Sequence, residues 1–138
     1  MSKKKLLVVD DERGFVDIVS ERLSVKGFDI LSAFDGKEGF EKARSERPDL
    51  IILDILMPKM NGYELCKNLK LDEDLKDIPI IMLTVRFEPN DIVFGKTVGA
   101  DAYLSKPLEL ELLLHTVNML LNSKRRQIND KTFTSGSR

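Results

Sequence analysis

Four short apolar runs in this sequence each end in side chains that can take part in chemistry. In chain order, these side chains belong to Asp10 and Asp11, Asp54, Thr84 and Lys106. A carboxylate can act as a nucleophile or bind a metal ion, and an ammonium group or a hydroxyl can contact the oxygens of a phosphoryl group. If they converge in the folded chain, these groups are suited to phosphoryl transfer.

The three aspartates can share a site only if positive charge accompanies them. Two carboxylates 4 Å apart repel each other by roughly 4 kcal/mol at an effective dielectric constant near 20. Lys106 alone cannot neutralise three carboxylates. Because Mg²⁺ binds through one or two carboxylates, water and a phosphate oxygen, the sequence predicts a magnesium site.

Asp54 is the candidate nucleophile. It closes the apolar run 50–53 and is followed by Ile55-Leu56-Met57-Pro58, a segment that cannot begin a helix cleanly, so a helix cap does not explain this aspartate. Asp10 and Asp11 are paired in a way that suits metal binding, whereas Asp54 stands apart. Attack by its carboxylate on a phosphoryl group would form an acyl phosphate.

Each of these residues also has an ordinary structural interpretation. Asp10 or Asp11 could cap the helix expected to start near residue 12, a use of aspartate worth about 1 kcal/mol. Thr84 could be a plain strand residue and Lys106 a solvated charge. We favour the functional interpretation because all of them fall at strand ends, and we expect Lys106 and Thr84 to contact the phosphoryl oxygens.

The spacing of apolar residues predicts five strands that alternate with five helices. The strands are expected at residues 6–9, 30–33, 50–53, 80–83 and 102–104. The helices are expected at residues 12–26, at 36–47, from 62, from about 89 through Gly95 as the weakest of them, and after 107. Such alternation requires crossover connections and a parallel sheet, and continuous apolar runs indicate strands that are buried on both faces. The predicted fold class is a doubly wound α/β fold, in which ligands bind at the carboxyl ends of the strands.

Apolar stripes predict which face of each helix is buried. In the first helix the stripe consists of Phe15, Ile18, Val19 and Leu23. In the third helix it consists of Leu65, Cys66 and Leu69. In the last and strongest helix it consists of Leu110, Leu113, Leu114, Val117 and Leu121.

The composition fits one domain that buries a core without disulfides. Of the 138 residues, 42% are hydrophobic and 33% are charged, and the single cysteine, Cys66, cannot form an intramolecular disulfide. The formal net charge of -1 gives no reason to expect nucleic-acid or membrane binding, and no segment approaches the roughly 20 apolar residues of a membrane-spanning helix. Residues 1–5 lack the apolar region of a signal peptide, so we expect a cytoplasmic protein.

The expected domain covers residues 4–122. From residue 123 the sequence turns polar and loses its apolar period. We therefore expect residues 123–138 to form a frayed helix end followed by a disordered tail or linker.

Several motifs resemble those of a response-regulator receiver domain of two-component signal transduction, of the chemotaxis-regulator type. They are Val9-Asp10-Asp11, the segment from Asp54 to Gly62, Thr84, the segment from Gly99 to Leu104, and Lys106-Pro107. The similarity covers about residues 4–122, and the order, spacing and strand placement of the motifs all agree. The resemblance implies a flavodoxin-like fold with strand order 2-1-3-4-5 and a cis peptide bond before Pro107.

The resemblance also implies a role for each residue. Asp54 would accept a phosphoryl group from a histidine kinase or a phosphotransfer protein, assisted by Lys106 and Thr84. Mg²⁺ would be held by Asp10, Asp11, Asp54 and the backbone carbonyl of Leu56. A domain of this kind phosphorylates and dephosphorylates itself but turns over no free metabolite, so we do not expect an enzyme in the usual sense.

The signal is expected to leave the site through Thr84 and Tyr103. By the resemblance, Thr84 moves toward the phosphoryl group and Tyr103 turns inward behind it; the plain alternative is a half-buried tyrosine on an edge strand. The output face would be formed by the fourth helix, the fifth strand and the fifth helix, and would act on a downstream protein or output domain. The sequence leaves open whether this is a single-domain regulator or part of a longer one, and whether it is a monomer or a phosphorylation-dependent dimer.

Two positions depart from the usual pattern of the family. Leu56 stands two residues after Asp54, where a polar group is common, and Val85 follows Thr84, where a small residue is common. Both would place apolar bulk beside the phosphoryl group. We hypothesise that they hinder the entry of hydrolytic water and lengthen the lifetime of the phosphorylated form.

Two other classes of function are weighed against the receiver. An aspartyl-phosphate phosphatase of similar fold would have a second acid two residues after the nucleophile, where this chain has Leu56. A flavodoxin-like nucleotide-binding protein would have a glycine-rich turn after the first strand, where this chain has Asp10-Asp11-Glu12-Arg13. The receiver remains the favoured interpretation.

Overall fold

The computed structural model describes residues 3–57, 60–84 and 99–133, with residues 84 and 124–133 described by their backbone alone. A parallel sheet of five strands has the order β2-β1-β3-β4-β5. The strands are β1 (Lys5–Val9), β2 (Asp29–Ala33), β3 (Leu50–Asp54), β4 (Ile80–Thr84) and β5 (Ala102–Ser105). The predicted doubly wound fold and the order implied by the resemblance are both confirmed.

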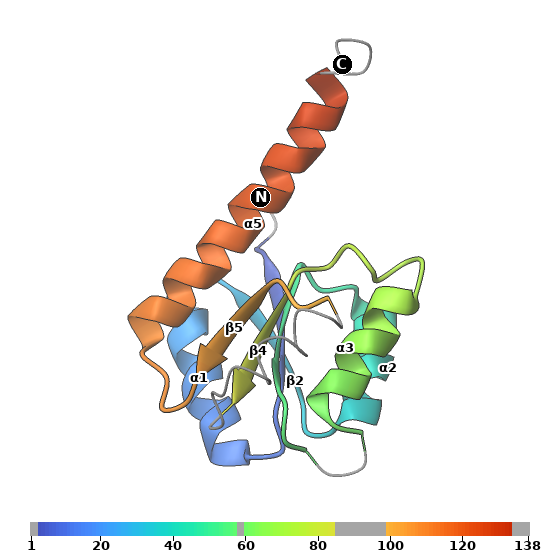
Figure 1. Ribbon diagram of the computed structural model, residues 1–138. Coiled ribbons are helices and arrows are strands. Elements are labelled where there is room, and N and C mark those ends of the chain that lie inside the picture. The colour runs from blue at the N-terminus through green and yellow to red at the C-terminus, as the bar shows by residue number, and fades with distance from the viewer. Residues whose placement is uncertain (1–2, 58–59, 85–98, 134–138) are drawn as a thin grey trace.

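Helices cover both faces of the sheet in the described part of the chain. They are α1 (Arg13–Val25), α2 (Gly36–Glu46), α3 (Gly62–Leu71) and α5 (Leu110–Phe133). Figure 1 shows α1 and α5 on one side of the sheet and α2 and α3 on the other. The helix predicted near residues 89–95 lies outside the described residues.

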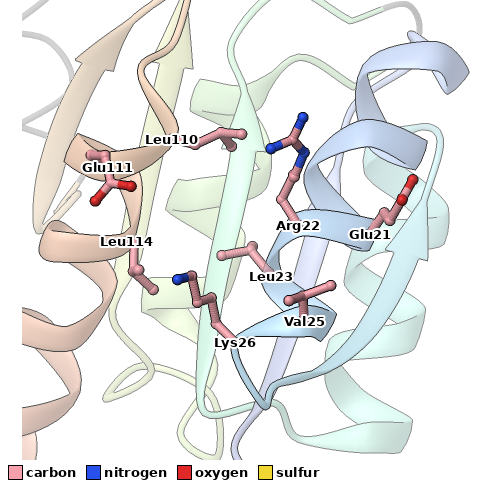
Figure 2. A pocket seen from close by; sticks show the side chains of 8 residues that line it. All are labelled: Glu21, Arg22, Leu23, Val25, Lys26, Leu110, Glu111 and Leu114. Carbon is pink, nitrogen blue, oxygen red and sulfur yellow. The ribbon is translucent and has the colours of Figure 1, made fainter.

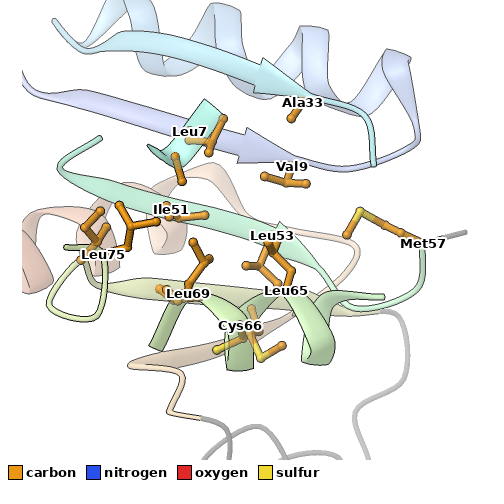
Figure 3. Packing of buried hydrophobic residues seen from close by; sticks show 14 of the residues in the cluster. Leu7, Val9, Ala33, Ile51, Leu53, Met57, Leu65, Cys66, Leu69 and Leu75 are labelled. Atoms are coloured by element: carbon orange, nitrogen blue, oxygen red, sulfur yellow. The ribbon is translucent and has the colours of Figure 1, made fainter. Parts of the chain in front are cut away.

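Alternation of side chains along the strands divides the core into two apolar clusters. On one face, Leu7, Val9, Ile51, Leu53, Ile80 and Met82 pack with residues of α3, including Leu65, Cys66 and Leu69 (Figure 3). On the other face, Leu6, Val8, Leu50, Ile52, Ile81 and Leu83 pack with residues of α1 and α5. A slip of one residue in any strand would exchange these two sets, so the core fixes the register of the sheet.

Cys66 is a core residue, as the sequence predicted. Its side chain is fully buried in the cluster beneath α3. Burial raises the pKa of the Cys66 thiol to about 11, because the thiolate loses its hydration. The thiol is therefore neutral at physiological pH and packs as a small apolar group.

The predicted stripe of α1 is partly wrong. Val19 and Leu23 are buried and Phe15 is partly buried, but Ile18 is 58% exposed and Val16 is buried instead. The buried residues Val16, Val19 and Leu23 follow the i, i+3, i+7 spacing of one helical face, and Ile18 lies on the edge of that face. The sequence pattern thus predicted burial of Ile18, whereas the structure buries Val16.

The helix α5 extends farther than the apolar period indicated. Leu113 and Val117 anchor it against the sheet. The helix continues to Phe133, although the sequence becomes polar from residue 123. Lysine, arginine and glutamine favour helix even without an apolar face, which explains why the helix does not end where its stripe ends. Figure 1 shows its last turns projecting away from the sheet. The division of the chain at residue 122 stays a prediction, and in the described residues no helix is long and apolar enough to cross a membrane.

Candidate functional site

The carboxyl ends of β1 and β3 bring the three aspartates together. β1 and β3 are neighbours in register, with Val9 beside Leu53, so Asp10 and Asp54 follow side by side at one edge of the sheet. Asp10, Asp11 and Asp54 each offer a carboxylate oxygen within 4.8 Å of the others. Asp10 is 1% exposed and Asp54 is 7% exposed, whereas Asp11 faces solvent. The residues that the sequence singled out on two separate strands therefore share one site.

Both carboxylate oxygens of Asp10 have a partner. The backbone N–H of Glu12 donates to Oδ1 at 3.0 Å, and the Lys106 ammonium donates to Oδ2 at 2.7 Å. The residue that precedes the first turn of α1 is Glu12, and its side chain makes no capping hydrogen bond. Asp10 thus fixes the loop between β1 and α1 and also binds Lys106, which comes from the far end of the chain. It does not act as the cap of α1.

Lys106 lies between the two buried carboxylates. Its Nζ is 2.7 Å from Asp10 Oδ2 and 3.9 Å from Asp54 Oδ1, and its side chain is 12% exposed. The Lys106–Pro107 peptide bond is cis, as the resemblance implied. One ammonium group thus lies between two carboxylates with a third beside them, and the uncompensated charge suits a divalent cation.

Burial changes the acidity of Asp54. Desolvation raises the pKa of its carboxyl to about 6, and repulsion from Asp10 adds to this shift. Lys106 and a hydrogen bond with the backbone of Leu56 oppose the shift, while Asp11 adds a smaller upward contribution. At neutral pH the carboxylate is still mostly ionised, which a nucleophile requires.

The loop after Asp54 is held close to the strand end. The N–H of Ile55 donates to the carbonyl of Leu83 at 3.0 Å, and the N–H of Gly62 donates to the carbonyl of Ile55 at 2.8 Å. A Cβ at position 62 would lie 2.3 Å from the carbonyl oxygen of Asp54, so only glycine allows α3 to start this close to β3. Gly62 therefore fixes the path of the segment that carries Leu56.

An open cavity of about 410 Å³ lies over these groups and is lined by Asp10, Asp11, Glu12, Asp54, Leu56 and Lys106. Its donors are carboxylate oxygens, the ligands that hard cations such as Mg²⁺ prefer, so the residues present fit such an ion. Leu56 is 45% exposed at the rim and contributes aliphatic surface.

The two predicted switch residues are described to different extents. Thr84 ends β4 and pairs with Ser105, and its side chain lies outside the described part of the structure. Tyr103 is partly buried on β5, and its hydroxyl lies 3.4 Å from that of Tyr63 on α3. Val85 is outside the described residues.

Sequence reasoning missed an aromatic residue at this site. The Nζ of Lys106 lies over the ring of Phe15, 4.1 Å from its centroid. The stripe of α1 marked Phe15 only as a core residue, and its position four residues after Asp11 was the one available hint.

Beside the acidic cavity lies an apolar groove of about 470 Å³. It is lined by Glu12, Phe15, Ile18, Val19, Lys106, Pro107, Leu108 and Leu110. Glu12 and Lys106 line both hollows, so the groove adjoins the cavity. The exposed side chain of Ile18, which the stripe of α1 placed in the core, lies on this groove.

A third hollow, of about 430 Å³, lies between α1 and α5 and is not lined by Asp10, Asp11 or Asp54. Figure 2 shows Arg22 of α1 and Lys26, which follows this helix, reaching toward Leu110 and Leu114 of α5, with Leu23 between them. Glu21 and Glu111 also line it, so charges of both signs are mixed there. It contains none of the chemically competent residues of the acidic site.

Known proteins match both the sequence and the geometry. The family model of the response regulator receiver domain matches residues 6–118. The alkaline phosphatase synthesis transcriptional regulatory protein PhoP of Bacillus subtilis is 45% identical over 104 residues, which are 75% of this chain and 42% of that protein. The DNA-binding dual master transcriptional regulator RpaA of Synechocystis is 39% identical over 122 residues, 88% of this chain and 51% of that protein. The chain thus spans about half the length of these curated relatives.

A solved structure agrees with the fold. The chemotaxis protein CheY4 of Vibrio cholerae superimposes with a TM-score of 0.83 at 38% identity, and the match covers 86% of this chain and 99% of that one.

The raised pKa of Asp54 predicts that this residue destabilises the fold at neutral pH. Its folded-state pKa of about 6 exceeds the unfolded value of about 3.9, so the folded state binds the proton more tightly and stability falls as pH rises between these values. In the absence of divalent cations, Asp54→Asn should raise the free energy of unfolding near pH 7 by about 2–3 kcal/mol. Below about pH 4 the difference should disappear.

Urea denaturation with a chelator present, repeated across this pH range, measures the effect. Asp17→Asn, at an exposed position on α1, is the matched control and should change stability little at any pH. Equal stabilities of wild type and Asp54→Asn at neutral pH would contradict the prediction.

Proposed function

The chain belongs to the response regulator receiver domain family of two-component signal transduction, and we propose that Asp54 is its phosphoacceptor. The phosphodonor is a histidine kinase or a phosphotransfer protein, and the protein acts in the cytoplasm. The observation that carries this proposal is the position of one ammonium group between two buried carboxylates, with a third carboxylate beside them.

The chemistry follows from these groups. A carboxylate oxygen of Asp54 attacks the phosphorus, the bond from phosphorus to the donor nitrogen breaks, and its electron pair returns to the imidazole ring. Lys106 and the Thr84 hydroxyl contact the phosphoryl oxygens and stabilise the charge that they carry. Asp10, Asp11, Asp54 and the Leu56 carbonyl would hold Mg²⁺, which supplies positive charge that the single lysine cannot.

The phosphoryl group then acts as a switch. It replaces the single negative charge of the Asp54 carboxylate by the roughly two negative charges of an acyl phosphate at the end of β3, and Thr84 and Tyr103 would sense this dianion by moving toward the site. The receiving surface would be formed by β5, α5 and the helix that the sequence predicts near residues 89–95, which lies outside the described residues. The relatives named above are transcriptional regulators about twice as long, so we propose that this face acts on an output domain or a downstream protein.

An aspartyl-phosphate phosphatase of similar fold is the weaker alternative. That chemistry would need a general acid near the leaving group, two residues after the nucleophile. Leu56 occupies this position, lines the cavity and has no proton to donate. A self-phosphorylating signalling domain therefore fits the site better than a hydrolase with a free substrate.

Incubation with Mg²⁺ and a small phosphodonor such as acetyl phosphate should add one phosphoryl group to the chain. Intact-mass measurement detects the adduct, and Asp54→Ala should abolish it because the proposal assigns the neighbouring carboxylates, Asp10 and Asp11, to the metal ion. Asp17→Ala, away from the site, should be phosphorylated like the wild type. A chain that stays unmodified, or an adduct that persists in Asp54→Ala, would overturn the assignment.

Leu56→Asn should shorten the lifetime of the phosphorylated form severalfold. Leu56 places aliphatic surface at the rim of the cavity, and an amide there would admit and orient a water molecule instead. The decay of phosphorylated protein after removal of the donor measures the rate. Leu71→Asn, at an exposed leucine on α3, is the control; equal decay of wild type and Leu56→Asn would reject the hypothesis.

The apolar groove is proposed as the docking surface for the protein phosphodonor. Such a partner must bring a phosphohistidine to Asp54, and the groove adjoins the acidic cavity through Glu12 and Lys106. Ile18→Glu should therefore slow phosphotransfer from a cognate kinase by about tenfold or more, because it buries a charge in an apolar contact. Phosphorylation by acetyl phosphate should be unchanged.

The control for this experiment is Leu71→Glu, which adds the same charge at an exposed leucine on a different helix. It should affect neither donor. If Ile18→Glu slowed both donors equally, the defect would lie in the site rather than in docking, and the groove would not be the docking surface.

A further inference from the structure

Lys106 is held from three sides in this structure. Two of the contacts are ionic, with Asp10 at 2.7 Å and with Asp54 at 3.9 Å. The third is the ring of Phe15, whose centroid lies 4.1 Å from Nζ. The electron-rich face of an aromatic ring attracts an ammonium ion, most strongly where water is largely excluded, as it is around this lysine.

The ring differs from the carboxylates in one respect that matters for the chemistry. It carries no net charge and offers no ligand to a metal ion, so a divalent cation on Asp10 and Asp11 would not compete for it. The ion pair between Lys106 and Asp10 depends on a carboxylate that such a cation would also use. The contact with Phe15 would survive this competition.

We propose that Phe15 is a positioning residue that holds the Lys106 ammonium beside Asp54 for phosphoryl transfer. The inference rests on the proposed function of Asp54. Lysine has a long flexible stem, so a lysine without this third contact samples more positions and meets the phosphoryl oxygens less often. Phe15 does not touch the reacting atoms and acts through Lys106.

Packing alone does not account for an aromatic residue at this position. Phe15 is partly buried against the cluster beneath α1 and α5 and lines the apolar groove, a place that leucine would also fill. Only an aromatic ring also attracts the ammonium ion. This difference separates a positioning role from a structural one, because leucine keeps the apolar contact and removes the ring.

The first measurement is the rate of Asp54 phosphorylation by acetyl phosphate, as a function of donor concentration. Phe15→Leu should lower the rate at saturating donor by about tenfold and leave the half-saturating concentration nearly unchanged. Phe15→Tyr keeps the ring and should restore the wild-type rate. The unfolding midpoint of each variant identifies any loss that comes from folding.

Phe34→Leu is the matched control. The guanidinium carbon of Arg13 lies over the ring of Phe34, 3.9 Å from its centroid. Phe34→Leu therefore removes a similar contact between a cation and a ring without touching Lys106. Its phosphorylation rate should equal that of the wild type.

A double-mutant cycle tests whether Phe15 acts through Lys106. In a Lys106→Ala background, Phe15→Leu should cause no further loss, because the group that it positions is gone. An equal tenfold loss in both backgrounds would overturn the proposal, and so would a wild-type rate in Phe15→Leu or a failure of Phe15→Tyr to restore the rate.

A readout independent of activity is the NMR signal of the Lys106 ε-methylene protons. Their place beside the ring should shift this signal upfield in the wild type and in Phe15→Tyr, and the shift should be lost in Phe15→Leu. A signal without such a shift in the wild type would overturn the contact. If the shift is present but wild-type Asp54 is not phosphorylated, the proposed function fails while the contact stands.

Discussion

Repulsion between carboxylates is the constraint on which the arrangement of this molecule depends. Asp10 and Asp54 are almost fully buried at the ends of adjacent strands, with Asp11 beside them, and one lysine lies between the two buried carboxylates. The pKa of Asp54, raised to about 6, shows that the fold tolerates a charge that its surroundings disfavour. Such a site is stable only because the rest of the chain holds it in place, and it gains from any further positive charge that enters.

What holds it in place is the register of a sheet whose central strands are largely apolar and buried. The groups of the site come from the ends of β1, β3 and β5, and the ion pair between Asp10 and Lys106 joins residues 96 positions apart. Strands such as β3 are buried along their whole length, and each fully buried aliphatic side chain contributes roughly 1.5–3 kcal/mol. Two opposed apolar clusters prevent the strands from sliding, so the distances between charged groups are set by the core rather than by flexible loops.

The sequence could predict much of this because strand ends are easy to find. Asp54 followed an unbroken apolar run, and a parallel sheet necessarily gathers such ends at one edge, so the meeting of Asp10, Asp11, Asp54 and Lys106 was predictable.

The exact buried face of a helix could not be predicted in the same way. Ile18 and Val16 are both apolar and two positions apart, and only the packing against the sheet decides which one is buried. The ring of Phe15 beside Lys106 was hidden for the same reason, because a contact across 91 positions leaves no local pattern. Composition likewise could not place the end of α5, since polar residues continue a helix as readily as they interrupt one.

The length of α5 turns it into a lever arm. Its first turns are clamped to the sheet by Leu113 and Val117, whereas its last turns stand clear of the body of the molecule (Figure 1). At 1.5 Å per residue, the helix is about 36 Å long, so a tilt of about 5° at the clamped end sweeps the far end through about 3 Å. Adjustments too small to disturb the core beneath Leu113 are thereby magnified into a displacement that is large on the scale of a side chain.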